Sequence, residues 1–244
     1  MASPEFEQLN HVLVAMRSIG LLWESNYHES IVGDGVRYID AKPRDSTECP
    51  EELKELYSKV KEGWGNTSGM DSFISRDITK EYTVKFIDSA LAEFKCTFRN
   101  DQLIKQRITY KQSPFFKSYE SEDLYAVIET GSEVGITEYW QLFGVKSPTI
   151  SELVSFRVDY DPSRFEAHKH PRTHLHLSDR EDCRICVDTP LDPRSFFVFV
   201  VSHFYSSKRD ELIETLSGWE NHTRFPSSIE DEESTHIHLN LGHT

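Results

Sequence analysis

The chain has 244 residues, of which 37% are hydrophobic and 12% aromatic, so it can bury a core and is not intrinsically disordered. Its formal net charge of −14 disfavours nonspecific coating of nucleic acid, leaves room for a small basic cleft, and suits a basic protein partner. No apolar run approaches the roughly 18 residues of a membrane span, and the first residues lack the apolar stretch of a signal peptide. We therefore expect a cytoplasmic protein with no membrane segment.

Two helices are predicted in the N-terminal part, about residues 1–70. Apolar residues recur at helical spacing from Pro4 to about Trp23. The second helix, CPEELKELYSKVKEG, has Pro50 in its first turn, followed by two glutamates that suit the positive helix end, and Gly63 as its stop. The GWGNTSG stretch that follows is typical of a loop.

Alternation of apolar and polar residues predicts strands in the sheet-rich part, about residues 71–244. The stretches EYTVKFI, EFKCTF and LIKQRITY should form an antiparallel meander, with a turn at Arg99–Asp101. We expect Glu152–Tyr160, Thr173–Leu177 and Cys183–Val187 to be strands of one antiparallel sheet.

The C-terminal part should add helices and a last strand. Asp192 suits a helix cap and Pro193 the first turn of a helix that runs to Phe204 and packs on the apolar face of the sheet. A shorter helix is expected at KRDELIETL and a strand at STHIHLNL. The whole chain, residues 1–244, then forms a single α+β domain: an antiparallel sheet with N-terminal helices and a C-terminal helix packed on it.

Histidines are concentrated in the stretch HKHPRTHLHL, which holds four of the eleven in the chain. Residues two apart in a strand point the same way, so His174 and His176 share a face, and His236 and His238 repeat this arrangement. If the two strands are neighbours, four imidazoles meet and could bind a divalent metal such as Zn²⁺ or Mn²⁺. They could equally serve as acid and base, or lie on a polar sheet face open to water.

Two cysteines follow this stretch with the spacing CRIC. Together with His174 and His176 they would supply the ligands of a Cys₂His₂ zinc site. In an extended strand, however, Cys183 and Cys186 point to opposite faces, so this sequence does not favour a shared zinc ion.

Arginine, histidine and tyrosine side chains cluster in the same region. In metal-independent phosphoryl transfer, arginine holds the phosphate and histidine moves the protons. The alternative is that Arg157–Asp159 and Arg184–Asp188 are surface ion pairs of little consequence. The candidate catalytic residues are His174, His170, Arg157, Arg184 and Tyr160.

The C-terminal half resembles a bacterial family that is catalogued only as a domain of unknown function. The resemblance rests on FRVDYDP, HPRTHLHL and CRICVDTPLDPRSFFVFVVSHFY, and it spans about residues 150–206 with a looser match upstream. The family usually has proline where Cys186 stands, which weakens a CxxC zinc site further. The resemblance implies a bacterial single-domain protein and no established activity. Its matching residues are Arg157, Asp159, Tyr160, Asp161, Pro162, His170, Pro171, His174, Cys183, Arg184, Pro193, Phe196, Phe204 and Tyr205.

Three functions are compatible with these patterns. The first is a nuclease or phosphoesterase in a toxin or phage-defence setting, with RNA or another phosphodiester bound in a local basic cleft. The second is a non-enzymatic acidic adaptor or neutralising subunit of a multiprotein bacterial system. The third is a metal-binding sensor built on the histidine face. A positive cleft in which Arg157, His174 and Arg184 converge would favour the first, and a flat acidic face the second.

Overall fold

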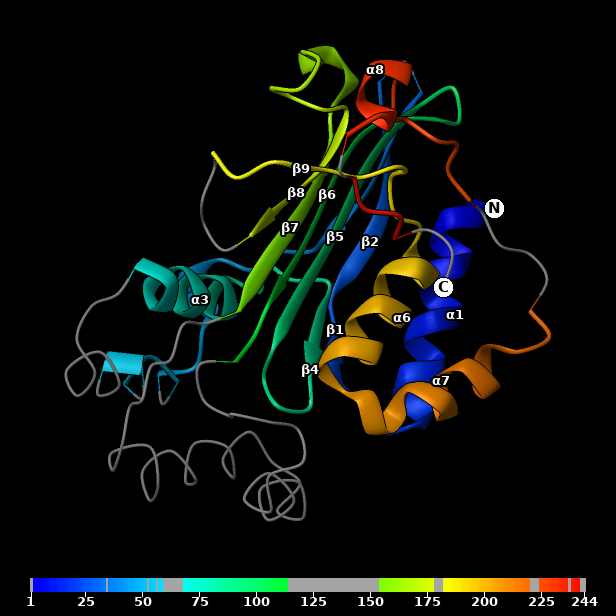
Figure 1. Ribbon diagram of the computed structural model, residues 1–244. Helices are drawn as coiled ribbons and strands as arrows, with labels where there is room; N and C mark the ends of the chain where they lie inside the picture. Colours follow the sequence, from blue (N-terminus) through cyan, green and yellow to red (C-terminus); the bar gives the residue numbers. More distant parts are fainter. Residues whose placement is uncertain are drawn as a thin grey trace.

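The computed structural model describes residues 2–33, 35–51, 53–55, 57–58, 68–113, 154–177, 182–219, 224–236 and 238–241. Its central feature is an antiparallel sheet of nine described strands in the order β1-β4-β5-β6-β7-β8-β9, with β3 also pairing with β5 and β2 with β3 (Figure 1). The strands are β1 (Leu22–Ser25), β2 (Tyr27–Val32), β3 (Val36–Ala41), β4 (Val84–Phe86), β5 (Leu91–Arg99), β6 (Gln102–Lys111), β7 (Ser155–Tyr160), β8 (Thr173–Leu177) and β9 (Ile185–Cys186).

Three helices, α1 (Pro4–Ser18), α6 (Pro193–Phe204) and α7 (Arg209–Leu216), cover one face of the sheet, which we call the helical face (Figure 1). Both long helices begin as the sequence predicts, because Ser3 and Asp192 accept hydrogen bonds from the first-turn backbone and a proline follows each of them. The core lies between this layer and the sheet and is rich in aromatic side chains, including Phe94, Tyr110, Phe156, Phe196 and Phe197.

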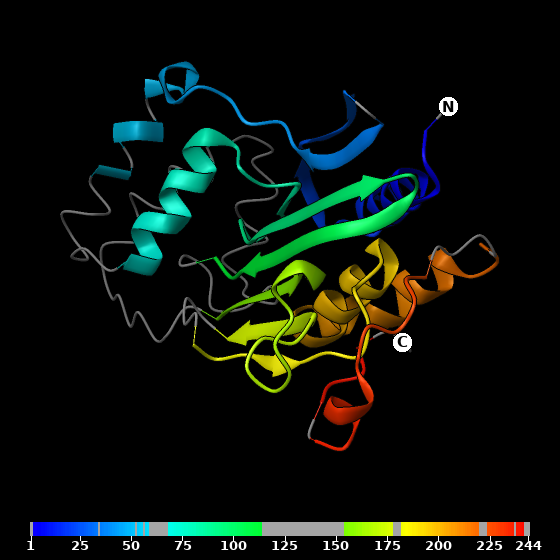
Figure 2. The ribbon, with the colours of Figure 1, turned by 90° about the horizontal axis from the view of Figure 1, so that it is seen from above.

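The opposite face of the sheet, which we call the open face, carries the polar residues that alternate with this core. Helix α3 (Ser68–Thr79) lies over one end of it, where Arg76 contacts Glu93 of β5 and Ser72 contacts Lys111 of β6. Seen from above, α3 stands apart from the three helices of the helical face (Figure 2). A short helix, α8 (Asp231–Ser234), lies near the C-terminus.

The predicted α+β class, the β5–β6 meander, the β7-β8-β9 sheet and the capped helix α6 are confirmed. The first helix ends at Ser18, five residues before the predicted end, because the apolar residues that follow enter β1. Helix α3 and the hairpin of β2 and β3 were not predicted. The expected helix over residues 49–63 is confirmed at residues 51, 53–55 and 57–58, which are helical, and its other residues after 51 lie outside the described part of the chain.

The strand predicted at STHIHLNL is wrong. Its first residue, Ser234, ends α8, and Leu239 forms a single parallel bridge with Val187 rather than a strand ladder. Alternation of polar and apolar residues is not sufficient evidence for a strand here. The same pattern over eight residues also fits an irregular segment that contacts the sheet at one residue.

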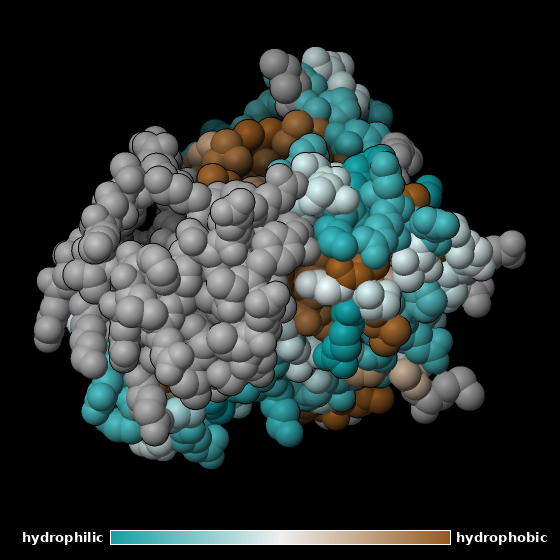
Figure 3. Space-filling view, turned by 90° about the horizontal axis from the view of Figure 1, so that it is seen from below, coloured by the Kyte–Doolittle hydropathy of each residue, from teal (hydrophilic) through white to brown (hydrophobic). Residues whose placement is uncertain are grey.

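The described helices contain none that is long and apolar enough to cross a membrane. Seen from below, the coloured part of the surface is mostly hydrophilic and is interrupted by a few hydrophobic patches (Figure 3). This agrees with a chain in which 28% of the residues are charged.

Candidate functional site

A row of charged and imidazole side chains crosses four strands in register on the open face. Lys95 of β5 pairs with Arg107 of β6, Arg107 with Asp159 of β7, and Asp159 with His174 of β8. Residues in register on neighbouring antiparallel strands have Cβ atoms about 5 Å apart, so each side chain can contact the next. The adjacent row on the same face contains Thr109, Arg157 and His176.

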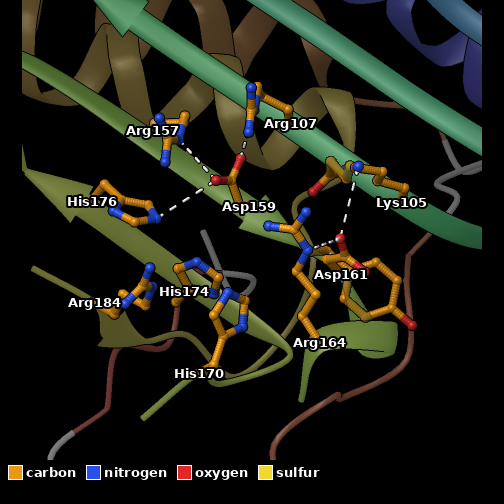
Figure 4. A pocket seen from close by; sticks show the side chains of 12 residues that line it. Lys105, Arg107, Arg157, Asp159, Asp161, Arg164, His170, His174, His176 and Arg184 are labelled. Carbon is orange, nitrogen blue, oxygen red and sulfur yellow. Dashed lines mark hydrogen bonds and ion pairs between the residues drawn. The ribbon is translucent and has the colours of Figure 1, made fainter. Parts of the chain in front are cut away.

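The two rows open into a pocket of about 140 Å³ (Figure 4). Around it stand five cationic side chains, three imidazoles and only two carboxylates. This balance is the reverse of the chain as a whole, whose net charge is −14. The lining residues are Lys105, Gln106, Arg107, Arg157, Asp159, Tyr160, Asp161, Arg164, His170, His174, His176 and Arg184.

Asp159 is the electrostatic centre of the pocket. Its Oδ1 accepts a hydrogen bond from Arg107 Nε at 3.0 Å, and its Oδ2 accepts one from Arg157 Nε at 2.8 Å. Oδ2 also lies 3.6 Å from His176 Nε2. Figure 4 shows the three partners converging on this carboxylate from different directions. One carboxylate therefore orients two guanidinium groups and leaves a net positive charge around itself.

His174 has a defined proton arrangement. Its Nδ1 lies 2.9 Å from the carbonyl oxygen of Pro171, and since a carbonyl can only accept, Nδ1 carries the hydrogen and Nε2 keeps a lone pair. Burial is the main cause that lowers the pKa of His174 to about 4, so its imidazole is neutral at pH 7. Its ring centroid is 4.7 Å from those of His170 and His176, so three imidazoles form a contiguous series.

His170 lies on the connection between β7 and β8, which places its imidazole beside that of His174. This connection starts with Asp161, which accepts a hydrogen bond from the Ser163 backbone and lies within 4 Å of Lys105 and Arg164. It ends with a turn in which His168 has φ +63° and the backbone of His170 donates to the carbonyl of Glu166. The Nδ1 atom of His170 is buried without a hydrogen-bond partner among the described residues, so a ligand could supply one.

Arg184 approaches the imidazoles from the other side, just before β9 (Figure 4). Its side chain is exposed, and it makes no ion pair or hydrogen bond with any residue that the structure describes. The alternative in which Arg184 pairs with Asp188 is therefore not what the structure contains. Arg157, in contrast, does form the expected contact with Asp159.

The structure brings all five candidate catalytic residues to this one pocket, together with His176. The alternative of a solvated histidine face is wrong, because His174 and His176 are each only 2% exposed. Tyr160 belongs by alternation to the helical face, but it lies at the end of β7 and reaches the pocket rim. Burial raises the pKa of its phenol, which stays protonated.

His236 and His238 do not join the other histidines. Both are exposed, and His236 packs against His168, with ring centroids 4.4 Å apart. They follow α8 instead of occupying a strand beside β8, so the geometry that the four-histidine prediction required is missing.

A different set of side chains could hold a metal ion. One ligand atom from each of Asp159, His174 and His176 lies within 4.8 Å of the others, and this is the one such group of three found among the described residues. The carboxylate in this group is already held by two guanidinium groups, which would repel a divalent cation. Cys183 and Cys186 are free thiols outside the group.

Sequence reasoning did not assign five charged residues of the pocket to the site, among them the central carboxylate Asp159, which it considered as an ion-pair partner of Arg157. Arg107 and Lys105 lie on β6, and their place became visible only with the pairing of β6 to β7, which is separated from it by more than 40 residues. Asp161 and Arg164 belong to the β7–β8 connection. The signal that was available is the alternation in β6, where Lys105, Arg107 and Thr109 share one face and Ile108 and Tyr110 share the other.

The chain matches a protein family over most of its length. A family model described as "Uncharacterized conserved protein (DUF2290)" matches residues 63–241. No curated protein and no solved structure matches the chain. The matched region contains every residue that lines the pocket.

Proposed function

The chain belongs to this family, whose description names no activity, and from its pocket we propose that it binds phosphodiesters and hydrolyses them by proton transfer at His174. The observation that carries the proposal is the collection of five cationic side chains around three imidazoles in a strongly acidic chain. Because the chain as a whole carries a net charge of −14, the positive charge of this pocket is a local feature.

Phosphate binding follows from the arginines. Guanidinium groups bind phosphate oxygens through paired, charge-assisted hydrogen bonds. Arg107 and Arg157 are each oriented by Asp159 through Nε, an arrangement in which the terminal nitrogens can serve the ligand. Arg184, which has no partner among the described residues, adds a third donor group beside the imidazoles.

Proton transfer follows from the histidines. A water molecule held at the phosphate would give a proton to Nε2 of His174 while its oxygen forms a bond to phosphorus. The bond from phosphorus to the leaving oxygen then breaks, and that oxygen takes a proton from a neighbouring imidazole. We assign this role to His170, whose ring centroid lies 4.7 Å from that of His174 and which is less buried than His176. The arginines stabilise the charge that develops on the phosphoryl oxygens.

A second candidate is metal-assisted hydrolysis at Asp159, His174 and His176, favoured by the closeness of their ligand atoms. A divalent ion there would polarise the phosphate and activate water. The two guanidinium groups on Asp159 make the metal-free reaction the better fit. Chelation separates the two, because prolonged treatment with a chelator abolishes only the metal-dependent reaction.

The test is cleavage of a small phosphodiester, such as a dinucleotide, by wild type and two variants. His174→Ala and His174→Gln should both lose about 10²–10⁴ in rate, because each removes the proton acceptor. Glutamine fills most of the volume and its amide can still donate to the carbonyl of Pro171, so this variant keeps the fold if alanine does not. His203→Ala removes an exposed histidine of α6 and serves as the matched control.

Melting temperatures are recorded for all four proteins, since His174 is buried. A folded His174→Gln protein that cleaves as fast as wild type would show that the histidine is structural. A wild type that cleaves no dinucleotide or cyclic nucleotide would leave the non-enzymatic adaptor as the better account of the chain.

A further inference from the structure

A second hollow adjoins the pocket on the open face. It lies over β5 and β6 and is lined by Arg76, Glu93, Lys95, Thr97, Lys105 and Arg107. Lys105 and Arg107 also line the pocket described above, so the two hollows adjoin at these side chains, and together we call them the depression.

The second hollow is also positively charged, with four cations and one carboxylate. Three of the cations are accessible: the side chains of Lys95 and Arg107 are each 47% exposed and that of Lys105 is 58% exposed. Lys95 contacts Asp40 and Arg76 contacts Glu93. The Lys95–Asp40 pair, whose side chains are 47% and 24% exposed, contributes little to stability, so Lys95 can exchange Asp40 for a phosphate. The Arg76–Glu93 pair is more buried, at 26% and 12%.

The distance covered by the cations indicates the size of the ligand. Lys95 and His174 stand at the two ends of the register row, three strand spacings apart. At about 4.8 Å per spacing this is roughly 14 Å, more than one phosphate group can cover and within reach of several linked phosphates.

We propose that the natural ligand is a single strand of nucleic acid, whose backbone crosses β5 and β6 through Lys95, Lys105 and Arg107 and enters the histidine pocket with one phosphodiester. We call the path over Lys95, Lys105 and Arg107 the single-strand track. The cleavage part of this inference rests on the function proposed above, whereas binding along the track does not. A regular series of phosphates matches cations placed at strand spacing on neighbouring strands.

A single strand fits better than a duplex because of the depth of the histidines. His174 and His176 are each 2% exposed, so the reacting phosphate must leave the surface to reach them. A flexible single strand can bring a phosphate to these histidines without unpairing any bases, whereas in a duplex this requires local unpairing, which costs free energy.

The experiment measures the affinity of a labelled strand of about twelve nucleotides, a typical site size for such grooves, as RNA and as DNA, at several salt concentrations. The His174→Gln protein is used so that the strand stays intact. In that background Lys95→Gln should weaken binding about fivefold at 0.1 M salt and lower the slope of log K against log salt by about 0.7. Its loss on a dinucleotide should be smaller.

The matched control is Lys208→Gln, also in the His174→Gln background. Lys208 is paired with Glu211 beside α7 on the helical face, so this change alters the net charge equally but away from the depression. It should leave strand affinity and the salt slope as they are. The affinities measured for the RNA strand and the DNA strand show which of the two backbones binds more tightly to the depression.

Each outcome decides. The single-strand track is overturned if Lys95→Gln and Lys208→Gln have equal effects or if the protein binds no strand. It is also overturned if a duplex or an acidic peptide binds with the same affinity as the single strand. Cleavage of dinucleotides by wild type without preference for the longer strand overturns the track and keeps the proposed hydrolysis. Salt-dependent strand binding through Lys95 without any cleavage by wild type supports the track and rejects the hydrolysis.

Discussion

Gln106 on β6 exchanges two hydrogen bonds with the backbone of Leu191, 85 residues later. Its Nε2 donates to the carbonyl oxygen of Leu191 at 2.8 Å, and the backbone N–H of Leu191 donates to its Oε1 at 3.0 Å. Both residues are buried. The side chain thus acts as a strand partner for the segment that enters α6, and it fixes the helical layer to the strand that carries Arg107.

Replacing Gln106 by Leu should therefore destabilise the protein by about 2–5 kcal/mol, because a buried N–H and a buried carbonyl of Leu191 lose their partners. Urea unfolding measures the change. Gln102→Leu, at the exposed start of the same strand, is the control and should change stability by less than about 0.5 kcal/mol. A Gln106→Leu protein as stable as wild type would mean that water satisfies the Leu191 backbone.

Asp88 is a buried carboxyl whose pKa is raised by desolvation to about 6. The native state then keeps a proton that the unfolded state, with a pKa of 3.8, has already lost. The free energy of unfolding consequently falls as pH rises from about 4 to about 6, by about 3 kcal/mol in total. Asp88 still accepts hydrogen bonds from the backbone of Ala90 and the hydroxyl of Tyr205.

Asp88→Asn keeps an oxygen for both donors and cannot ionise, so it should stabilise the protein at pH 8 by up to about 3 kcal/mol and by much less at pH 4. The measurement is the difference in unfolding free energy between wild type and variant across this pH range. The contributions of the other carboxylates are the same in both proteins and cancel in this difference. A difference that does not depend on pH would mean that Asp88 titrates normally in the native state.

The β5–β6 hairpin turns through Asn100 and Asp101, with φ values of 51° and 58°. A two-residue turn with positive φ at both positions favours Asn-Gly. Asp101→Gly should therefore raise the melting temperature by a few degrees, since it relieves about 1 kcal/mol of left-handed strain and loses only a long contact with Arg37. Asp101→Ala keeps the strain and should not stabilise the protein.

Arg184 should contribute to ligand affinity and not to folding. Arg184→Gln is expected to weaken binding of a dinucleotide about 10–100-fold, the equivalent of about 1.5–3 kcal/mol for hydrogen bonds to a charged group. Its melting temperature should stay close to that of wild type because the side chain is exposed. Arg209→Gln, an exposed arginine at the start of α7, is the control for loss of one charge. Equal affinities for the two variants would exclude Arg184 from the site.

Much of the sheet could be predicted because its strands alternate strictly, as in β5, where Phe94, Cys96 and Phe98 face the core. The clustering of Arg157, His170 and His174 could also be predicted, since β7 and β8 are close in sequence. Arg107 could not, because its contact with Asp159 depends on pairing across a long connection. The burial of His174 and His176 was equally hidden, because alternation assigns a residue to a face and says nothing of what covers that face.

The alternation of β6, β7 and β8 has a practical consequence for engineering. Most pocket residues on β6, β7 and β8 have a neighbour in the chain that belongs to the core, while Gln106 and Tyr160 line the pocket from the alternate positions. A library that varies positions 105, 107, 109, 157, 159, 174 and 176, and leaves the positions between them untouched, would sample new ligands while the hydrophobic core of these strands stays constant. Altered specificity and retained folding can thus be selected separately in this protein.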